Sequence, residues 1–168
     1  MAKQTRTSSC RLSTHGRPVL VVTNTWDRPT YTPVTAILSA HGMCPVVVEA
    51  DRVIANSQRL SVNMTGTEAT IHVDDYQFDV QDVGSAWYRK PHILQVERSD
   101  RSQALTFVQE VVTLQDAVWE LVPPDRWMNS PAAIKLASSK LKQLTLASSL
   151  GFITPHTVVG NRWTLCKS

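Results

Sequence analysis

The sequence predicts an α/β fold in which a small sheet, mostly parallel or mixed, lies between flanking helices. Two continuous β-branched runs, residues 18–23 and 44–49, are typical of strands buried on both faces, as in a parallel sheet. A helix-length segment at 34–40 separates them, which predicts a βαβ motif with a right-handed crossover. A long segment with 3.6-residue apolar periodicity ends near Val122 and predicts a helix with one buried face.

The segment between the first strand and this first helix, residues 24–33, is expected to be a loop because it carries two prolines. The helix is expected to end at His41-Gly42, since glycine suits a helix C-terminus.

The middle of the chain changes from continuous to alternating apolar residues. The alternation over 59–64, 70–73 and 76–80 predicts antiparallel strands with one solvent-facing side, and the first two are joined by a turn at 65–67. A further strand is expected at 83–88, just before Arg89-Lys90-Pro91.

Two helices are expected in the last third. Ser99-Asp100 can cap the long periodic helix, which Pro123-Pro124 ends. Asn129 or Ser130 can cap the next helix, with Pro131 in its first turn and Gly151 as its end. The expected buried stripe of this last helix consists of Ile134, Ala137, Leu141 and Leu144.

Charge and composition exclude several classes of protein. The net charge is +3, but residues 67–82 carry only acids and the chain beyond Asp125 carries only bases. Because a nucleic-acid binder needs a continuous basic footprint, this division argues against one. The sequence has no run of eighteen apolar residues, so no membrane span is predicted. Its three cysteines lie far apart, which favours a reducing cytoplasm over a disulfide framework.

Arg89 and Lys90 are the first candidate site residues. They follow a predicted strand, and ligands of open α/β sheets bind at the carboxyl ends of strands. The alternative, which the residues alone favour, is that Trp87 packs in the core and Arg89 pairs with an acid.

Three further candidates follow, of which Lys140 and Gln143 are the weaker. Asn129 begins a helix whose free amides could meet an anion, although a capped helix that binds nothing is the commoner case. Lys140 and Gln143 share one helix face, but a structural pairing of Lys140 with a carboxylate elsewhere in the chain is the favoured alternative. No catalytic residue or metal site is predicted, because His72 and Asp74 are too few for zinc and no glycine-rich phosphate loop is present.

Five features in a fixed order resemble one family. After the βαβ start come Trp-Tyr-Arg-Lys-Pro at 87–91, Trp-Met-Asn-Ser-Pro at 127–131, Lys-Leu-Lys-Gln-Leu at 140–144 and Gly-Phe-Ile-Thr-Pro-His-Thr at 151–157. This order resembles the Rossmann-like, three-layer pre-ATP-grasp domain of the ATP-grasp peptide maturases that make microviridin-like graspetides. Lys90 departs from the arginine usual in that family, which loses bidentate geometry.

The resemblance covers about 18–159 and implies a division of the chain. Residues 1–17 would be a basic disordered tail and 18–125 the pre-ATP-grasp domain. Residues 126–159 would be a linker helix and strand leading to an ATP-grasp domain that the chain lacks, and 160–168 an atypical end. The implied activity of the whole enzyme uses ATP and magnesium to phosphorylate a precursor-peptide carboxylate, which a side chain then attacks to form an ester or amide.

Several expectations follow from this resemblance. The chain alone would bind no cofactor and would be an inactive structural domain. Its expected partners are an ATP-grasp domain, a precursor peptide and a second copy in a homodimer, but neither nucleic acid nor a membrane. Two alternatives stay open: a stand-alone module that binds a peptide or nucleotide, and the front domain of another ATP-grasp carboxylate-amine ligase.

Overall fold

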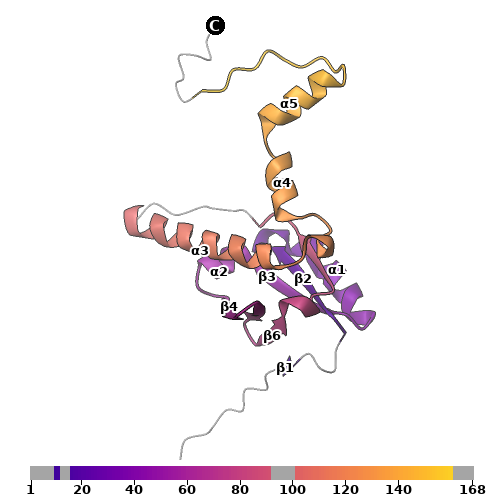
Figure 1. The fold of residues 1–168 in the computed structure, drawn as a ribbon, viewed down its shortest axis with the longest axis vertical. Coiled ribbons are helices and arrows are strands. Elements are labelled where there is room, and N and C mark those ends of the chain that lie inside the picture. The colour runs from indigo at the N-terminus through magenta and orange to yellow at the C-terminus, as the bar shows by residue number, and fades with distance from the viewer. Residues whose placement is uncertain (1–9, 12–15, 92–100, 161–168) are drawn as a thin grey trace, which may run out of the picture. The chain divides into compact units, whose positions relative to one another are not determined.

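The computed structural model describes residues 10–11, 16–91 and 101–160. The chain divides into two compact units, Met1–Pro131 and Ala132–Ser168. Figure 1 shows the elements of each unit in chain order, and they confirm the predicted α/β fold.

A parallel sheet forms the centre of the first unit. Its middle strand is β2 (Pro18–Thr23), flanked by β3 (Cys44–Glu49) and β7 (Ser85–Tyr88), both parallel to it. Leu20, Val21 and Val22 have no exposed surface. The prediction of strands is confirmed for both β-branched runs, but burial on both faces holds only for β2, since Cys44, Pro45 and Val47 of β3 are half-buried.

Helix α1 (Arg28–Ala40) begins earlier than the sequence predicted, because residues 28–33 are helical and η2 (Thr25–Asp27) precedes them. The expected loop over 24–33 is therefore wrong. Pro29 lies in the first turn, where backbone N–H groups have no partner within the helix in any case. Pro33 lies inside the helix, and the carbonyl it leaves unpaired belongs to exposed Pro29, where water can bind.

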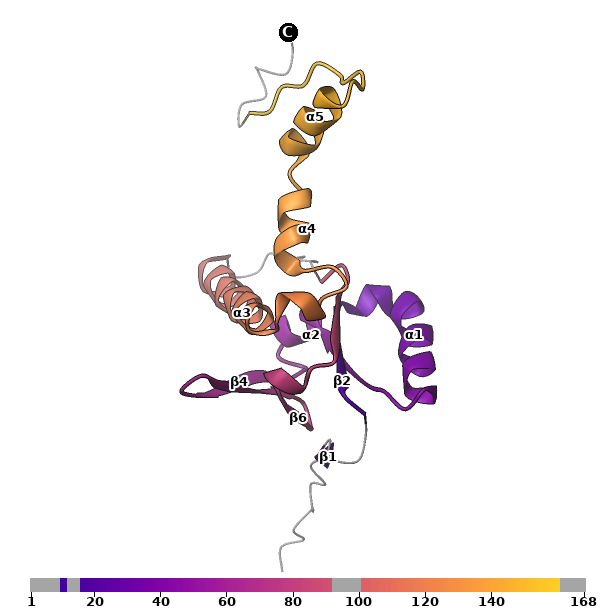
Figure 2. The same cartoon turned by 45° about the vertical axis from the view of Figure 1, so that its right-hand side comes forward.

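Helices cover both faces of the parallel sheet, as Figure 2 shows for α1 and α3 on opposite sides of β2. On the α1 side, Val19, Val21 and Tyr31 form a buried cluster, against which Leu38, Val47 and Trp87 pack. Helix α3 (Arg101–Leu121) supplies buried Val118 and Trp119. A short helix that the sequence did not predict, α2 (Ala50–Ile54), follows β3 directly, and Gln115 Nε2 donates to the Ala50 carbonyl at 3.4 Å.

The alternating segments form a second sheet. Strands β4 (Leu60–Thr65), β5 (Glu68–Val73) and β6 (Tyr76–Asp79) are antiparallel, and β1 (Cys10–Arg11) pairs parallel to β6. The expected tail at 1–17 thus contains one short strand, and the rest of that expectation up to residue 15 lies outside the described residues. The 3-10 turn η3 (Val80–Asp82) leads from this sheet to β7.

The chain after α3 returns to the parallel sheet. Beyond Pro123 and η4 (Pro124–Arg126), Trp127 forms a parallel bridge with Ala86, and the Met128 amide donates to the Ala86 carbonyl at 2.8 Å. This contact brings the Trp-Met-Asn-Ser-Pro stretch alongside β7.

The single last helix of the sequence prediction is instead two, α4 (Pro131–Ala137) and α5 (Lys140–Ser149). The break falls at Ser138-Ser139, since serine side chains compete for backbone hydrogen bonds, and Ser138 Oγ donates to the Ile134 carbonyl at 2.7 Å. Gly151 follows α5 with φ of +85°, as predicted for a helix end.

The buried stripe expected along that helix is not found. Ile134 and Leu144 are half-buried, whereas Ala137 and Leu141 are exposed. Residues 152–160 form neither helix nor strand. No helix in the described part of the chain is long and apolar enough to cross a membrane.

Candidate functional site

The three parallel strands end together at Thr23, Glu49 and Tyr88, which form the carboxyl edge of the sheet. The register pairs Thr23 with Glu49 and Val22 with Tyr88. Ligands of open α/β sheets bind at this edge, so its polar groups are the candidate functional site.

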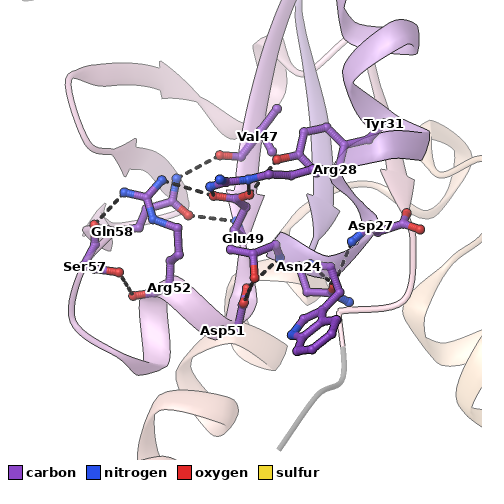
Figure 3. Close-up of polar contacts among 12 residues, drawn as sticks. Asn24, Asp27, Arg28, Tyr31, Val47, Glu49, Asp51, Arg52, Ser57 and Gln58 are labelled. Carbon is purple, nitrogen blue, oxygen red and sulfur yellow. Dashed lines mark hydrogen bonds and ion pairs between the residues drawn. The ribbon is translucent and has the colours of Figure 1, made fainter.

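Glu49 is the centre of a buried hydrogen-bond network at this edge. Figure 3 shows Arg28, Tyr31 and Arg52 converging on its carboxylate, whose side chain is only 3% exposed. Arg28 donates to both oxygens at 2.7 and 2.9 Å, Tyr31 Oη donates at 2.6 Å and Arg52 at 3.1 Å. Each carboxylate oxygen thus accepts two hydrogen bonds, which leaves no acceptor site for a ligand.

This network also shifts the pKa values of its members. Burial by itself would raise the pKa of Glu49, but hydrogen bonds from Arg28, Tyr31 and Arg52 outweigh burial and lower that pKa from 4.5 to about 2. Burial, reinforced by the hydrogen bond to Glu49, raises the pKa of Tyr31 to about 12. The hydrogen bond to Glu49 likewise raises the pKa of Arg28. Glu49 is therefore held as a carboxylate by fixed donors.

The lowered pKa predicts how stability depends on pH. The ionised Glu49 network contributes fully above pH 4.5, and its contribution is lost as the pH falls toward about 2, because in this range the unfolded state binds a proton at Glu49 that the folded state does not. The difference in unfolding free energy between wild type and Glu49→Gln, measured by denaturant titration, should therefore shrink over that range. A difference that stays constant over the same range would contradict the assignment.

Side-chain hydrogen bonds from Asn24 and Asp51 hold the turn between β2 and α1. Asn24 Oδ1 accepts the Trp26 and Asp27 amides at 2.9 and 3.1 Å, and Asn24 Nδ2 donates to the Lys90 carbonyl. Asp51 accepts the Thr25 amide at 3.0 Å and the Thr25 hydroxyl. In dinucleotide-binding folds such amides bind phosphate, whereas here an amide and a carboxylate of the protein already occupy them.

Arg89 is paired within the protein. Its guanidinium donates to Asp27 at 2.8 and 3.5 Å and lies 5.7 Å from the centre of the Trp87 ring. The structure therefore favours the alternative in which Trp87 packs against the core and Arg89 pairs with an acid. Lys90 is exposed, has φ of +45° and contributes its carbonyl to the Asn24 contact.

The other predicted residues lie at two places. Asn129 is exposed and follows Met128, whose amide bonds to Ala86, so Asn129 and Arg89 both lie near the carboxyl end of β7. Lys140 and Gln143 belong to the second unit, where Lys140 Nζ donates to Gln143 Oε1 at 3.3 Å and Gln143 Nε2 donates to the Ala137 carbonyl at 2.5 Å. Lys140 is therefore paired within its own helix, with an amide oxygen rather than with a carboxylate.

Sequence reasoning missed the most tightly bonded residue of the edge, Glu49. One signal was available, since a carboxylate that closes a continuous apolar run is buried against expectation and must find donors. The donors to Glu49 lie on α1 and α2. Their positions depend on how strands and helices are placed, and no local sequence pattern predicts them.

The edge does not fit the ATP and magnesium that the resemblance implies. Arg28 and Arg52 are bound by Glu49, Arg89 is bound by Asp27, and the amides of the turn are occupied. Within residues 16–91 and 106–160, no three His, Cys, Asp or Glu side chains are grouped so that they could hold a metal ion. No step of a reaction is therefore assigned to this edge.

Comparison with protein-family models and with curated proteins gives no match. Among solved structures, the chain is similar to the macrocyclase MdnB from Microcystis aeruginosa MRC, with a TM-score of 0.72 and 25% identity over 90% of this chain and 50% of MdnB. It is similar in fold to MdnC of the same source, bound with the precursor peptide MdnA, with a TM-score of 0.72, 20% identity and 89% and 49% coverage. A RiPP-associated ATP-grasp ligase from Chryseobacterium gregarium, in complex with ADP and a leader and core peptide, matches with a TM-score of 0.61, 18% identity and 90% and 46% coverage.

The fold of this chain is an α/β fold similar to that of RiPP macrocyclases and of a RiPP-associated ATP-grasp ligase. The structural relatives of this chain are RiPP macrocyclases and an ATP-grasp ligase, so the resemblance predicted from the sequence motifs is confirmed. The chain spans about half the length of each of these relatives.

Proposed function

We propose that the chain is the N-terminal structural domain of an ATP-grasp ligase that cross-links a ribosomal precursor peptide in the cytoplasm. The observation that carries this proposal is the match to MdnB, which takes in 90% of this chain at a TM-score of 0.72. The cross-link would be a side-chain ester or amide formed through an acyl phosphate.

The role proposed for this domain is to shape one wall of the active-site cleft. The carboxyl edge supports that role, because Glu49 and Asp27 pair with its arginines and Asn24 and Asp51 accept the hydrogen bonds of its turn amides. An ATP-grasp domain would supply the groups that bind ATP and magnesium, and the precursor peptide would be the partner of the complete enzyme.

We therefore expect no ATP turnover by this chain alone. Purified residues 1–168 would be incubated with ATP, magnesium and MdnA, and ADP release would be followed together with loss of water from the peptide by mass spectrometry. MdnC treated in the same way serves as the positive control. ADP formation by the chain above the blank, abolished by a substitution within the chain, would show an activity of its own and refute the structural role.

The proposal that this domain belongs to an ATP-grasp ligase has a separate test. Sequencing the transcript that carries this chain should reveal coding sequence for an ATP-grasp domain in the same or a neighbouring frame. A transcript without such a domain would favour the stand-alone module, and calorimetry against ATP and MdnA would then show which of them, if either, binds.

A further inference from the structure

Lys90 differs from the other bases of the carboxyl edge in having no acidic partner. The arginines at this edge each pair with Glu49 or Asp27. Lys90 lies just after β7 and is exposed, and within residues 16–91 and 106–160 its ammonium group forms no ion pair. Its charge is therefore available to a ligand.

The backbone of Lys90 has a conformation that suits glycine better than lysine. Its φ is +45°, in the left-handed region that side chains with a Cβ atom rarely adopt. Hydrogen bonds hold it there, because Asn24 Nδ2 donates to the Lys90 carbonyl and the Arg89 amide donates to the Val22 carbonyl at 2.7 Å. Strained residues concentrate at binding sites, so a lysine in place of a less strained glycine indicates a use for its side chain.

Trp26 extends from the neighbouring turn, which also contains Asn24 and Asp27 (Figure 3), and is 76% exposed. The Asn24 side chain that binds the Lys90 carbonyl also accepts the Trp26 amide at 2.9 Å. The Trp26 amide and the Lys90 carbonyl therefore lie within roughly 8 Å of each other, given normal hydrogen-bond lengths. The ion pair between Arg89 and Asp27, at 2.8 Å, joins the same two segments. An indole ring and an ammonium group are thus held at one point of the edge.

The charged side chains joined together at this edge leave one positive charge unmatched. The bases are Arg28, Arg52, Arg89 and Lys90, and the acids are Asp27, Glu49 and Asp51. A single ammonium group matches a carboxylate, whereas a phosphate carries more charge and prefers free backbone amides or the paired donors of an arginine. Because the turn amides and the arginines are already bonded, a carboxylate is the anion that fits.

The exposed indole ring indicates what stands next to that carboxylate. Tryptophan is highly buried on average, and where it is exposed at a binding surface it often contributes most of the affinity. Its ring packs best against another apolar or aromatic side chain. A carboxylate and an apolar side chain a few ångströms apart occur together on neighbouring residues of a peptide.

We propose that Lys90 and Trp26 bind an acidic segment of a peptide. An Asp or Glu side chain of the peptide pairs with the Lys90 ammonium group, and a neighbouring apolar side chain packs on the Trp26 ring. The identity of this peptide rests on the proposed function, under which it is the precursor peptide of the ligase. This domain would then select an acidic segment of the substrate, and Lys90 is a binding residue that takes part in no covalent step.

The test is an NMR chemical-shift titration of the isotope-labelled full chain with blocked tetrapeptides, which detects weak binding. Acetyl-Thr-Phe-Asp-Thr-amide should shift the Lys90 amide and Trp26 indole resonances with a dissociation constant on the order of 1 mM. The peptide with Asn in place of Asp should bind roughly fivefold more weakly, the upper range for an exposed ion pair. The peptide with Ala in place of Phe should also bind more weakly.

Variants at Lys90 separate its charge from its effect on the fold. Lys90→Met should bind the Asp and Asn peptides equally, and Lys90→Arg should retain the difference between them. Lys90→Gly should lose that difference too, but it should raise the melting temperature because glycine relieves the left-handed strain. Lys142→Met, which removes another exposed lysine, should change neither result.

Variants at Trp26 test the apolar contact. Trp26→Ala should abolish the difference between the Phe and Ala peptides, since that difference depends on the indole ring. Phe107→Ala is the matched control, because Phe107 lies on α3 and is 49% exposed, and it should leave the difference unchanged.

Equal binding of the Asp and Asn peptides by wild type, or an undiminished difference between them in Lys90→Met, overturns the inference. Inorganic phosphate that shifts the Lys90 resonance at lower concentration than the Asp peptide overturns it as well, because the site would then be a phosphate site. None of these outcomes touches the proposed function, which the transcript and ATP turnover test. Peptide binding that depends on Lys90, without a coding sequence for an ATP-grasp domain, would support this site and refute the proposed function.

Discussion

Replacing Glu49 by glutamine should lower the free energy of unfolding at neutral pH by about 3 kcal/mol, because one buried carboxylate accepts all the hydrogen bonds of the network. The side chain is 3% exposed and bonds to Arg28, Arg52 and Tyr31. A glutamine keeps the shape, but its amide group presents hydrogens to one or more of these donors and removes the negative charge. Buried Tyr31 then loses its acceptor as well.

Urea denaturation of wild type and Glu49→Gln measures this effect, with an unchanged slope expected if both unfold in two states. Asp75→Asn is the matched control, since Asp75 pairs with Arg59 at 3.3 Å while both side chains are largely exposed. Exposed pairs contribute little, so the control should lose less than about 1 kcal/mol. Equal losses in the two variants would show that burial of the network does not matter.

Replacing Trp119 by alanine should cost about 4 kcal/mol, within the range for removing a large aromatic side chain from a core. Trp119 is 2% exposed and lies on α3 beside buried Val118, and Val122 directly after the helix is buried as well. Its loss would leave a cavity too large for the packed layer to close. For a domain of this size that is a large part of the total stability, so partial unfolding at 37 °C is expected.

Leu114→Ala is the control for Trp119→Ala, because Leu114 lies on the same helix and is 41% exposed. It should change the unfolding free energy by less than about 1 kcal/mol. Thermal unfolding followed by circular dichroism compares the two variants. A small loss in Trp119→Ala would mean that α3 contributes little to the fold.

The carboxyl edge shows how a sheet of a ligand-binding type can be closed by its own side chains. In many α/β proteins the loop after the first strand leaves its amides free for a phosphate. Here Asn24 and Asp51 bind those amides, and carboxylates of Glu49 and Asp27 bind the neighbouring arginines. At this edge, hydrogen bonds within the protein occupy the groups that other proteins leave free for a ligand, which agrees with the structural role proposed for this domain.

Prediction from sequence succeeded where a signal is local. Continuous β-branched runs predicted β2 and β3, alternation predicted the strands of the antiparallel sheet, and Pro123 and Gly151 marked helix ends. Two prolines predict a loop at the start of α1, and this prediction is wrong because one of them occupies a first-turn position of the helix. The sequence also predicts one helix in place of α4 and α5, because the apolar periodicity continues across Ser138-Ser139 although the helix is interrupted there.

The candidate site was predicted only in part for the same reason. Arg89 was singled out from its place after a strand, but its partner Asp27 is 62 residues away in the sequence. The donors to Glu49 come from two helices, one of which had no predicted counterpart.

The sequence by itself determined the class of fold, the two kinds of strand and the likeness to peptide ligases, since these depend on residue periodicity and short motifs. Only the tertiary structure decided that Glu49, Asn24 and Asp51 close the carboxyl edge. Hydrogen bonds between distant residues depend on strand order and helix position, and these are set by the packing of the whole unit rather than by any one segment of the chain.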